Sequence, residues 1–182
     1  IDCQGTITES DFYIPGDATA LSGVTCIAGS LRIESELTEL DEAALSSLQW
    51  IGGDLTVVQA VEPSSLRGLR KLTTVHGSVK ISANTLTTLT GLEKLTTAGG
   101  AFDLSDNGAL EQVDALAMLA SVGGELWIVH NAALDNLDGL SALRTVGSFV
   151  FILENGSPAS RRAASRASAA IYASTATRGS RT

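Results

Sequence analysis

The chain has 182 residues, of which 44% are hydrophobic and only 4% aromatic, and its formal net charge is −8. This length and composition indicate one domain with an aliphatic core. The negative charge argues against nucleic acid as a partner, because it repels phosphates, and the sequence contains no run of about 18 apolar residues that would span a membrane.

Residues 1–28 precede the first repeat and contain the two cysteines of the chain, Cys3 and Cys26. A bridge between them would close a loop of about 24 residues and would stabilise an N-terminal cap by about 3.5 kcal/mol through chain entropy. It would also indicate an oxidising compartment. Two buried thiols in a cytosolic protein are the alternative. We expect no metal here, because neither His76 nor His130 lies near the cysteines in sequence and no Cys-x-x-Cys motif occurs.

Residues 29–155 are built from a phrase, Gly-x-apolar-x-apolar, whose opening glycines are 24, 24, 23, 24 and 23 residues apart. Its six copies are Gly29-Ser-Leu-Arg-Ile33, Gly53-Asp-Leu-Thr-Val57, Gly77-Ser-Val-Lys-Ile81, Gly100-Ala-Phe-Asp-Leu104, Gly124-Glu-Leu-Trp-Ile128 and Gly147-Ser-Phe-Val-Phe151. So regular an interval is typical of a stacked solenoid and not of a closed globule. The alternation within each copy predicts a short, half-buried strand.

Between the predicted strands the apolar residues are spaced by three, as in the series Leu110, Val113, Leu116, Leu119 and Val122. In an α-helix, five residues at this spacing would drift by about 240° around the axis and would not share one buried face. The spacing therefore predicts extended or 3₁₀ segments joined by turns. The fold class that we expect is a mostly β solenoid of the leucine-rich-repeat type, with about six coils of 23–24 residues, short parallel strands and few short helices.

Asparagines support this arrangement. Asn84, Asn107 and Asn131 each follow the glycine of their repeat by seven residues. A buried amide can bond to backbone groups that a turning chain leaves unpaired, so we expect a structural ladder and not a ligand site. Asn155 follows its glycine by eight residues, one position out of step, and the first two repeats have no Asn at this place.

The residue between the two apolar positions of each predicted strand faces outward, and stacking places these residues side by side about 4.8 Å apart. Because solenoids usually act through an exposed surface, this row is the candidate ligand-binding site. Its members are Arg32, Thr56, Lys80, Asp103, Trp127 and Val150. Trp127 is the strongest candidate anchor, unless a loop or the C-terminal segment covers it, and His130 is expected to adjoin it.

Residues 156–182 form a segment rich in Ala, Ser and Arg, with five arginines and no acidic residue, whereas residues 1–155 carry a net charge of −13. Three interpretations stay open for this segment. It is a loose tail, a short helix that caps the final coil, or a basic arm that binds an acidic partner or the acidic body of the chain itself.

No catalytic motif is present in the sequence, which lacks a Gly-x-Ser-x-Gly elbow, a phosphate-binding loop, a His-Glu-x-x-His motif and a cysteine beside a histidine. The pairs Asp103/Asp106 and Asp135/Asp138 offer the oxygen atoms that Ca²⁺ prefers, but without the ligand spacing of an EF-hand. Solvated turn residues are the favoured interpretation of both pairs. We therefore expect no enzymatic activity, no metal and no cofactor.

Three segments combine paired cysteines with Gly-x-Leu-x-Ile phrases: Cys3-Gln-Gly-Thr-Ile, Leu21-Ser-Gly-Val-Thr-Cys26-Ile-Ala-Gly29-Ser-Leu-Arg-Ile33 and Leu45-Ser-Ser-Leu-Gln-Trp-Ile51-Gly-Gly53-Asp-Leu. They resemble the opening of the receptor L domains, the leucine-rich solenoid modules of the insulin and EGF receptor ectodomains, and the resemblance covers residues 1–155. It implies a right-handed β-helix-like stack, a disulfide from Cys3 to Cys26 and a location outside the cytoplasm, without catalysis. Similar domains occur in fungal cell-wall and bacterial surface proteins, and the plain, regular coils look more like the bacterial ones.

These observations lead us to expect a secreted or cell-surface recognition module, of the bacterial envelope, that binds a protein or a glycan through the strand face. The alternative is a structural component of the cell envelope without a discrete ligand. The chain begins at Ile1, just before a cysteine, as a trimmed exported protein or an engineered fragment would.

Overall fold

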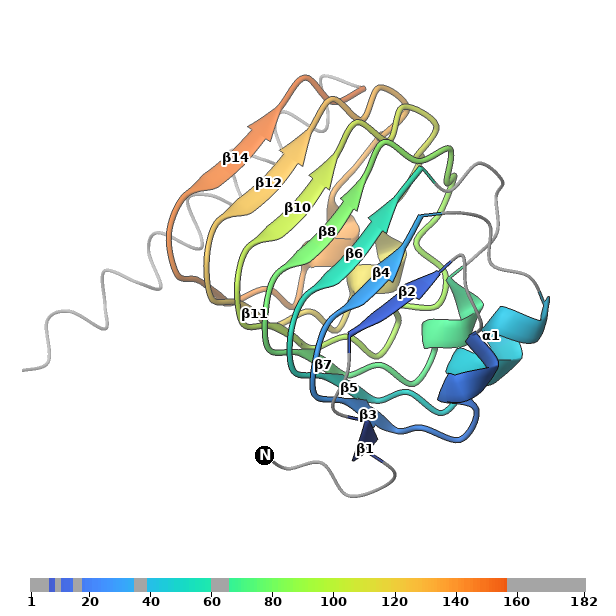
Figure 1. Cartoon of the computed structure of the whole chain (residues 1–182). Helices are drawn as coiled ribbons and strands as arrows, with labels where there is room; N and C mark the ends of the chain where they lie inside the picture. Colours follow the sequence, from blue (N-terminus) through green and yellow to red (C-terminus); the bar gives the residue numbers. More distant parts are fainter. Residues whose placement is uncertain (1–6, 9–10, 15–17, 35–38, 60–65, 157–182) are drawn as a thin grey trace, which may run out of the picture.

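The computed structural model describes residues 7–8, 11–14, 18–34, 39–59 and 66–156. Over these residues the protein is mostly β, with parallel strands in two sheets and few short helices, which confirms this part of the expected fold class (Figure 1). Consecutive strands of the chain alternate between the two sheets, so each strand pairs with a strand of the neighbouring repeat.

The larger sheet, here called the even-numbered sheet, contains the strands predicted from the glycine phrases. Among the described residues it has seven strands, in the order β14-β12-β10-β8-β6-β4-β2, and every pairing in it is parallel. The strands are β2 (Phe12–Ile14), β4 (Leu31–Ile33), β6 (Leu55–Val58), β8 (Val79–Ser82), β10 (Phe102–Ser105), β12 (Leu126–Val129) and β14 (Val150–Leu153). In most of them the side chains alternate between the buried core and the outer face, as a sheet with one wet face requires.

A second sheet, the odd-numbered sheet, was not predicted. Its seven described strands have two residues each and immediately precede the turns that lead into the even-numbered strands. They are β1 (Ile7–Thr8), β3 (Cys26–Ile27), β5 (Trp50–Ile51), β7 (Thr74–Val75), β9 (Thr97–Ala98), β11 (Ser121–Val122) and β13 (Thr145–Val146). From β3 to β13 the second residue of each strand is buried. It is the last residue in a series of apolar residues that are spaced three positions apart.

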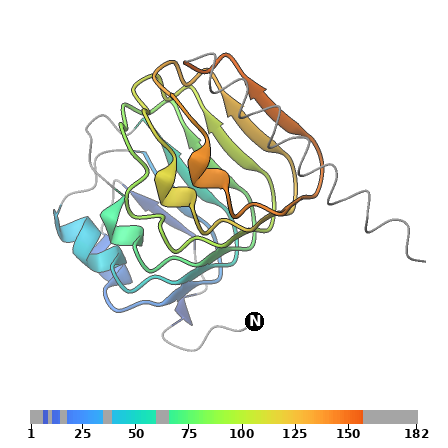
Figure 2. The same ribbon diagram turned by 180° about the vertical axis from the view of Figure 1, so that it is seen from behind.

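The helices lie in one row on the side that Figure 2 turns toward the viewer, from light-blue α1 through green and yellow to orange. They are η1 (Ala18–Leu21), α1 (Glu39–Leu45), η2 (Arg67–Leu69), η3 (Asp114–Leu116) and η4 (Asp138–Leu140), where η denotes a 3₁₀ helix. The expectation of short 3₁₀ segments is confirmed for η2, η3 and η4. Apolar residues spaced three positions apart match a 3₁₀ helix, which has about three residues per turn. No described helix is longer than the seven residues of α1.

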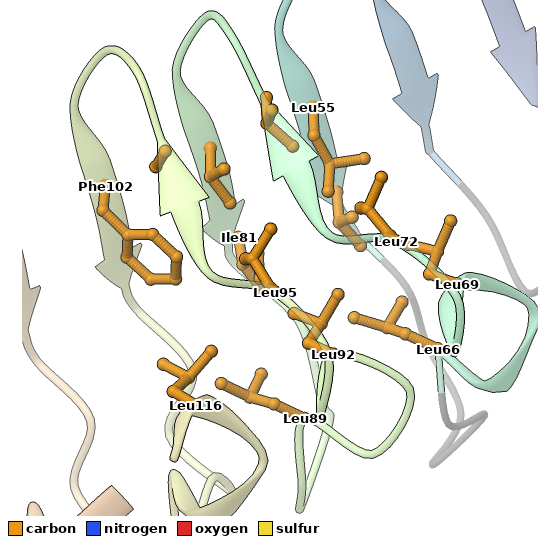
Figure 3. Close-up of a cluster of buried hydrophobic side chains, with 14 of the residues drawn as sticks. Leu55, Leu66, Leu69, Leu72, Ile81, Leu89, Leu92, Leu95, Phe102 and Leu116 are labelled. Carbon is orange, nitrogen blue, oxygen red and sulfur yellow. The ribbon is translucent and has the colours of Figure 1, made fainter. Parts of the chain in front are cut away.

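The core between the sheets and the helix row is one continuous aliphatic cluster that runs from Ile14 to Val146. Figure 3 shows its middle part, where the side chains of Leu55, Ile81 and Phe102 from the even-numbered strands share the interior with those of Leu69, Leu92 and Leu116. Each fully buried Leu contributes about 2 kcal/mol of hydrophobic stabilisation. The repeats thus bury in common the apolar surface that a single repeat would leave exposed.

A row of buried asparagines closes the interior where the even-numbered strands end. The Asn107 amide donates to the Ile81 carbonyl at 2.9 Å, and its Oδ1 accepts the backbone N–H and the side-chain N–H of Asn84 at 3.2 and 3.1 Å. One repeat further on, the Asn131 amide donates to the Leu104 carbonyl at 2.9 Å, and its Oδ1 accepts the backbone N–H of Asn107 at 3.1 Å. Asn155 accepts from the backbone and side-chain N–H of Asn131 at 3.1 and 3.0 Å. The ladder therefore has four members, and Asn155 is in step with the others.

The last repeat departs by one residue from the register predicted for it. Gly147 stacks on the first glycine of the preceding Gly-Gly pair, since a Cβ on Gly147 would lie 1.9 Å from the carbonyl oxygen of Gly123. One additional residue therefore separates this glycine from its strand. Val150, which we expected to face outward, packs against the core instead, and Phe151 occupies the outward position beside Trp127.

Several expectations fall on residues that the structure does not describe. The predicted disulfide includes Cys3, which lies outside the described residues, whereas Cys26 is buried in β3. The described residues also leave out positions 157–182, and with them nearly all of the predicted tail. In the part of the chain that is described, no helix is long and apolar enough to cross a membrane.

We predict that Asn107→Ala lowers the free energy of unfolding by about 2–4 kcal/mol, because the Ile81 carbonyl and two N–H groups of Asn84 lose their buried hydrogen bonds to the Asn107 side chain. Chemical denaturation followed by circular dichroism measures the change. Gln49→Ala, at an exposed position, is the matched control and should shift stability by no more than about 0.5 kcal/mol. Equal effects of the two substitutions would show that the ladder is dispensable.

Candidate binding surface on the even-numbered sheet

The outer face of the even-numbered sheet carries one continuous row of side chains, placed side by side by the strand register. The row runs through Tyr13, Arg32, Thr56, Lys80, Asp103, Trp127 and Phe151. Five of the six predicted members are in it, and Val150 is replaced by Phe151. Tyr13 was missed because its strand, β2, lies in the N-terminal region that has no glycine phrase.

The N-terminal end of the row is polar and charged. Glu34 follows β4 and accepts hydrogen bonds from the Tyr13 hydroxyl and from the Arg32 guanidinium. The bond from Tyr13, followed by that from Arg32, lowers the pKa of Glu34, and the same bond to Glu34 raises the pKa of Tyr13. This cluster is internally satisfied, which leaves little unmatched charge at this end.

The middle of the row combines a hydroxyl with an ion pair. Thr56 is half-buried between Arg32 and Lys80, and the Lys80 ammonium lies 3.8 Å from the Asp103 carboxylate. Exposed pairs of this kind contribute about 0–1 kcal/mol, because water screens them and both side chains lose freedom. The pair therefore contributes little to the stability of the fold.

The C-terminal end of the row is aromatic. The rings of Trp127 and Phe151 are stacked across β12 and β14, with centroids 4.0 Å apart and planes 17° from parallel, and the Phe149 ring lies 6.1 Å from that of Phe151. Trp127 is 38% exposed, Phe149 61% and Leu153 56%. We call Trp127, Phe149, Phe151 and Leu153 together the aromatic patch. Exposed apolar residues that adjoin in this way mark interaction surfaces more often than single ones do.

His130 adjoins the aromatic patch without belonging to the row. It follows β12 in the left-handed backbone conformation, with φ 58°, which carries its side chain to the corner of the sheet. There its two ring nitrogens lie 3.2 Å from the Asp106 carboxylate and 3.0 Å from that of Glu154. His76, the other histidine of the chain, packs edge-on against Trp50 of the odd-numbered sheet.

The residues weighed for metal binding do not come together in the structure. Asp106 contacts His130, and Asp138 opens η4 and its backbone N–H is bonded to Asn136. Within the described ranges no group of three His, Cys, Asp or Glu side chains could hold a metal ion. A hollow of about 230 Å³ lies on the helix side, lined by Thr88, Leu89, Thr90, Glu93, Gln112, Asp114 and Ala115.

Comparison with known proteins adds no relative, since no family model matches the chain and no curated protein matches it.

We predict that Tyr13→Phe raises the pKa of Glu34, because the hydroxyl that stabilises the ionised carboxylate is lost. In the intact protein the carboxylate contacts are complete above the ordinary pKa of a glutamate, and they weaken as the pH falls through the lowered pKa of Glu34. Carbon-detected NMR titration of the carboxyl measures both effects. Thr56→Ala, a row neighbour without a bond to Glu34, should leave the titration unchanged, and a Tyr13→Phe curve that matches wild type would contradict the prediction.

Proposed function

We propose that this chain is a non-enzymatic recognition module at the cell surface, which binds a protein or a glycan through the outer face of the even-numbered sheet. The observation that carries the proposal is the aromatic patch at the end of a row that is otherwise polar. Trp and other aromatic residues dominate the energy of many interfaces, where burying one removes a large apolar area from water.

The proposal includes the finer fold assignment, a right-handed solenoid of the receptor L-domain, leucine-rich type. It is supported by strand pairs that join residues 23 or 24 positions apart, by the asparagine row and by the Gly-x-apolar-x-apolar phrases. A stack of this kind offers a long, rigid outer face whose residues do not take part in the core. Binding by that face needs no rearrangement of the fold.

The proposed location outside the cytoplasm rests on a disulfide between Cys3 and Cys26. We predict that the protein isolated from its native source without reductant resists thiol alkylation, and that alkylation after reduction adds two alkyl groups to the intact mass. Reduction should also lower stability by about 3.5 kcal/mol, as expected for a bridge that closes a loop of this length. Free alkylation of both thiols before reduction would remove the argument for export.

A structural role in the envelope is the second candidate. It is favoured by the regularity of the repeats and by the strongly acidic composition of residues 1–155. A strain lacking the protein would then show altered wall strength with no ligand lost from the surface.

The recognition role predicts that Trp127→Ala, paired with Phe151→Ala, reduces retention of a surface-derived glycan or protein on the immobilised chain at least about tenfold, because the stacked rings supply the apolar contact. Retention is measured by a glycan array and by affinity capture with mass spectrometry. Met118→Ala, an exposed apolar residue next to η3, is the matched control and should retain wild-type binding. Equal retention by all three proteins would remove this face from consideration, and turnover in an assay of ester, glycan and peptide hydrolysis would overturn the non-enzymatic role.

A further inference from the structure

Negative charges predominate around the aromatic patch. The three adjacent stretches that form the patch and its borders, residues 101–106, 125–130 and 149–154, contain four carboxylates and neither Lys nor Arg. The carboxylates are Asp103, Asp106, Glu125 and Glu154. They lie on successive sides of the patch: Asp103 pairs with Trp127 on the neighbouring strand, Glu125 precedes β12, and Glu154 follows β14.

These carboxylates are weakly matched within the described part of the chain. Asp103 lies 3.8 Å from the Lys80 ammonium, and Glu125 is 3.5 Å from the Ser148 hydroxyl. Asp106 and Glu154 share the single ring of His130. At the N-terminal end of the row, by contrast, the Glu34 carboxylate accepts hydrogen bonds from both Arg32 and the Tyr13 hydroxyl.

The stacking geometry restricts what the rings can contact. Trp127 and Phe151 each cover one face of the other's ring. Each ring therefore keeps only its edge and its outer face for contact with a ligand. The outer face of Trp127 is turned toward β10, where Asp103 has a much shorter side chain than the indole. A cation placed above Asp103 would meet the carboxylate and the open indole face together, which combines an ion pair with a cation–π contact.

We propose that the aromatic patch and its border bind an extended protein segment in which basic and apolar residues alternate. This inference rests on the proposed recognition function and names its partner. Apolar side chains of the segment cover Phe149 and Leu153, and its Lys or Arg heads reach the surrounding carboxylates while their aliphatic stems lie on the rings. The border of acids repels an anionic glycan, and a neutral glycan offers no cation to pair with the carboxylates.

The test uses the full chain and a fluorescein-labelled peptide of about eight residues, alternating Lys and Leu, which spans about 26 Å when extended. One companion peptide replaces Leu by Ser, and the other replaces Lys by Glu. We expect both companions to bind at least about tenfold more weakly by fluorescence anisotropy, and we expect the affinity for the Lys-Leu peptide to fall as salt is raised, because screening shortens the reach of the carboxylates.

Two sets of variants locate the site. Trp127→Ala should weaken the Lys-Leu peptide at least about tenfold, and Glu125→Gln with Glu154→Gln should weaken it several-fold and flatten its salt dependence. Glu111→Gln with Asp114→Asn changes the same charge on the helix side and is the matched control, with wild-type affinity expected. Circular dichroism verifies that each variant is folded.

Three results would overturn the inference: no binding of the Lys-Leu peptide, an equal loss in the helix-side control, or binding that appears only after the five C-terminal arginines are replaced by Ser. The last result would make the basic segment of the chain itself the occupant. A glycan retained through Trp127 without any peptide binding would overturn this inference and leave the proposed recognition function standing. Loss of neither ligand on Trp127→Ala would reject the proposed function as well.

Discussion

Parallel backbone pairing between neighbouring repeats is the constraint on which the other features of this structure depend. From β3 onward the register places each residue beside its counterpart 23 or 24 positions along the chain, as in the pairs Lys80 with Asp103 and Asp103 with Trp127, whereas β1 and β2 pair with strands 19 positions away. Every position of the repeat therefore becomes a row, and each row has one environment along its length. Inward rows must be apolar, and the row at the strand ends must bond to backbone groups, which the asparagines do.

The outward row is the one place where this constraint leaves the choice of residue open. Its members contribute little to the core, so the row can change from a satisfied polar cluster at Tyr13 to stacked rings at Phe151 without loss of the fold. The two ends of this surface therefore differ in chemistry, with a polar N-terminal end and an aromatic C-terminal end. Apolar area and weakly matched negative charge coincide at the C-terminal end, and for this reason we propose recognition at that end.

The glycine phrases and the apolar spacing were enough to predict the even-numbered strands from β4 onward and short 3₁₀ segments, because both follow from local periodicity. The odd-numbered sheet was missed, since strands of two residues leave no alternation to detect. Phe151 was missed because Gly147 was aligned with the second glycine of the preceding pair, although the interval from Asn131 to Asn155 held the right register. The contacts of Glu34 depend on side-chain reach between strands, which spacing does not encode.

The nearly uniform separation of paired strands has a consequence for how the chain folds. Bringing together two segments about 24 residues apart costs about 3 kcal/mol of loop-closure entropy, and this amount is nearly the same for each neighbouring pair. The first pairing has to form without support, whereas each later one docks on a template that is already ordered. Assembly is then a zipper-like growth from an initial nucleus, and its barrier is set by two adjacent turns of the chain and not by its total length.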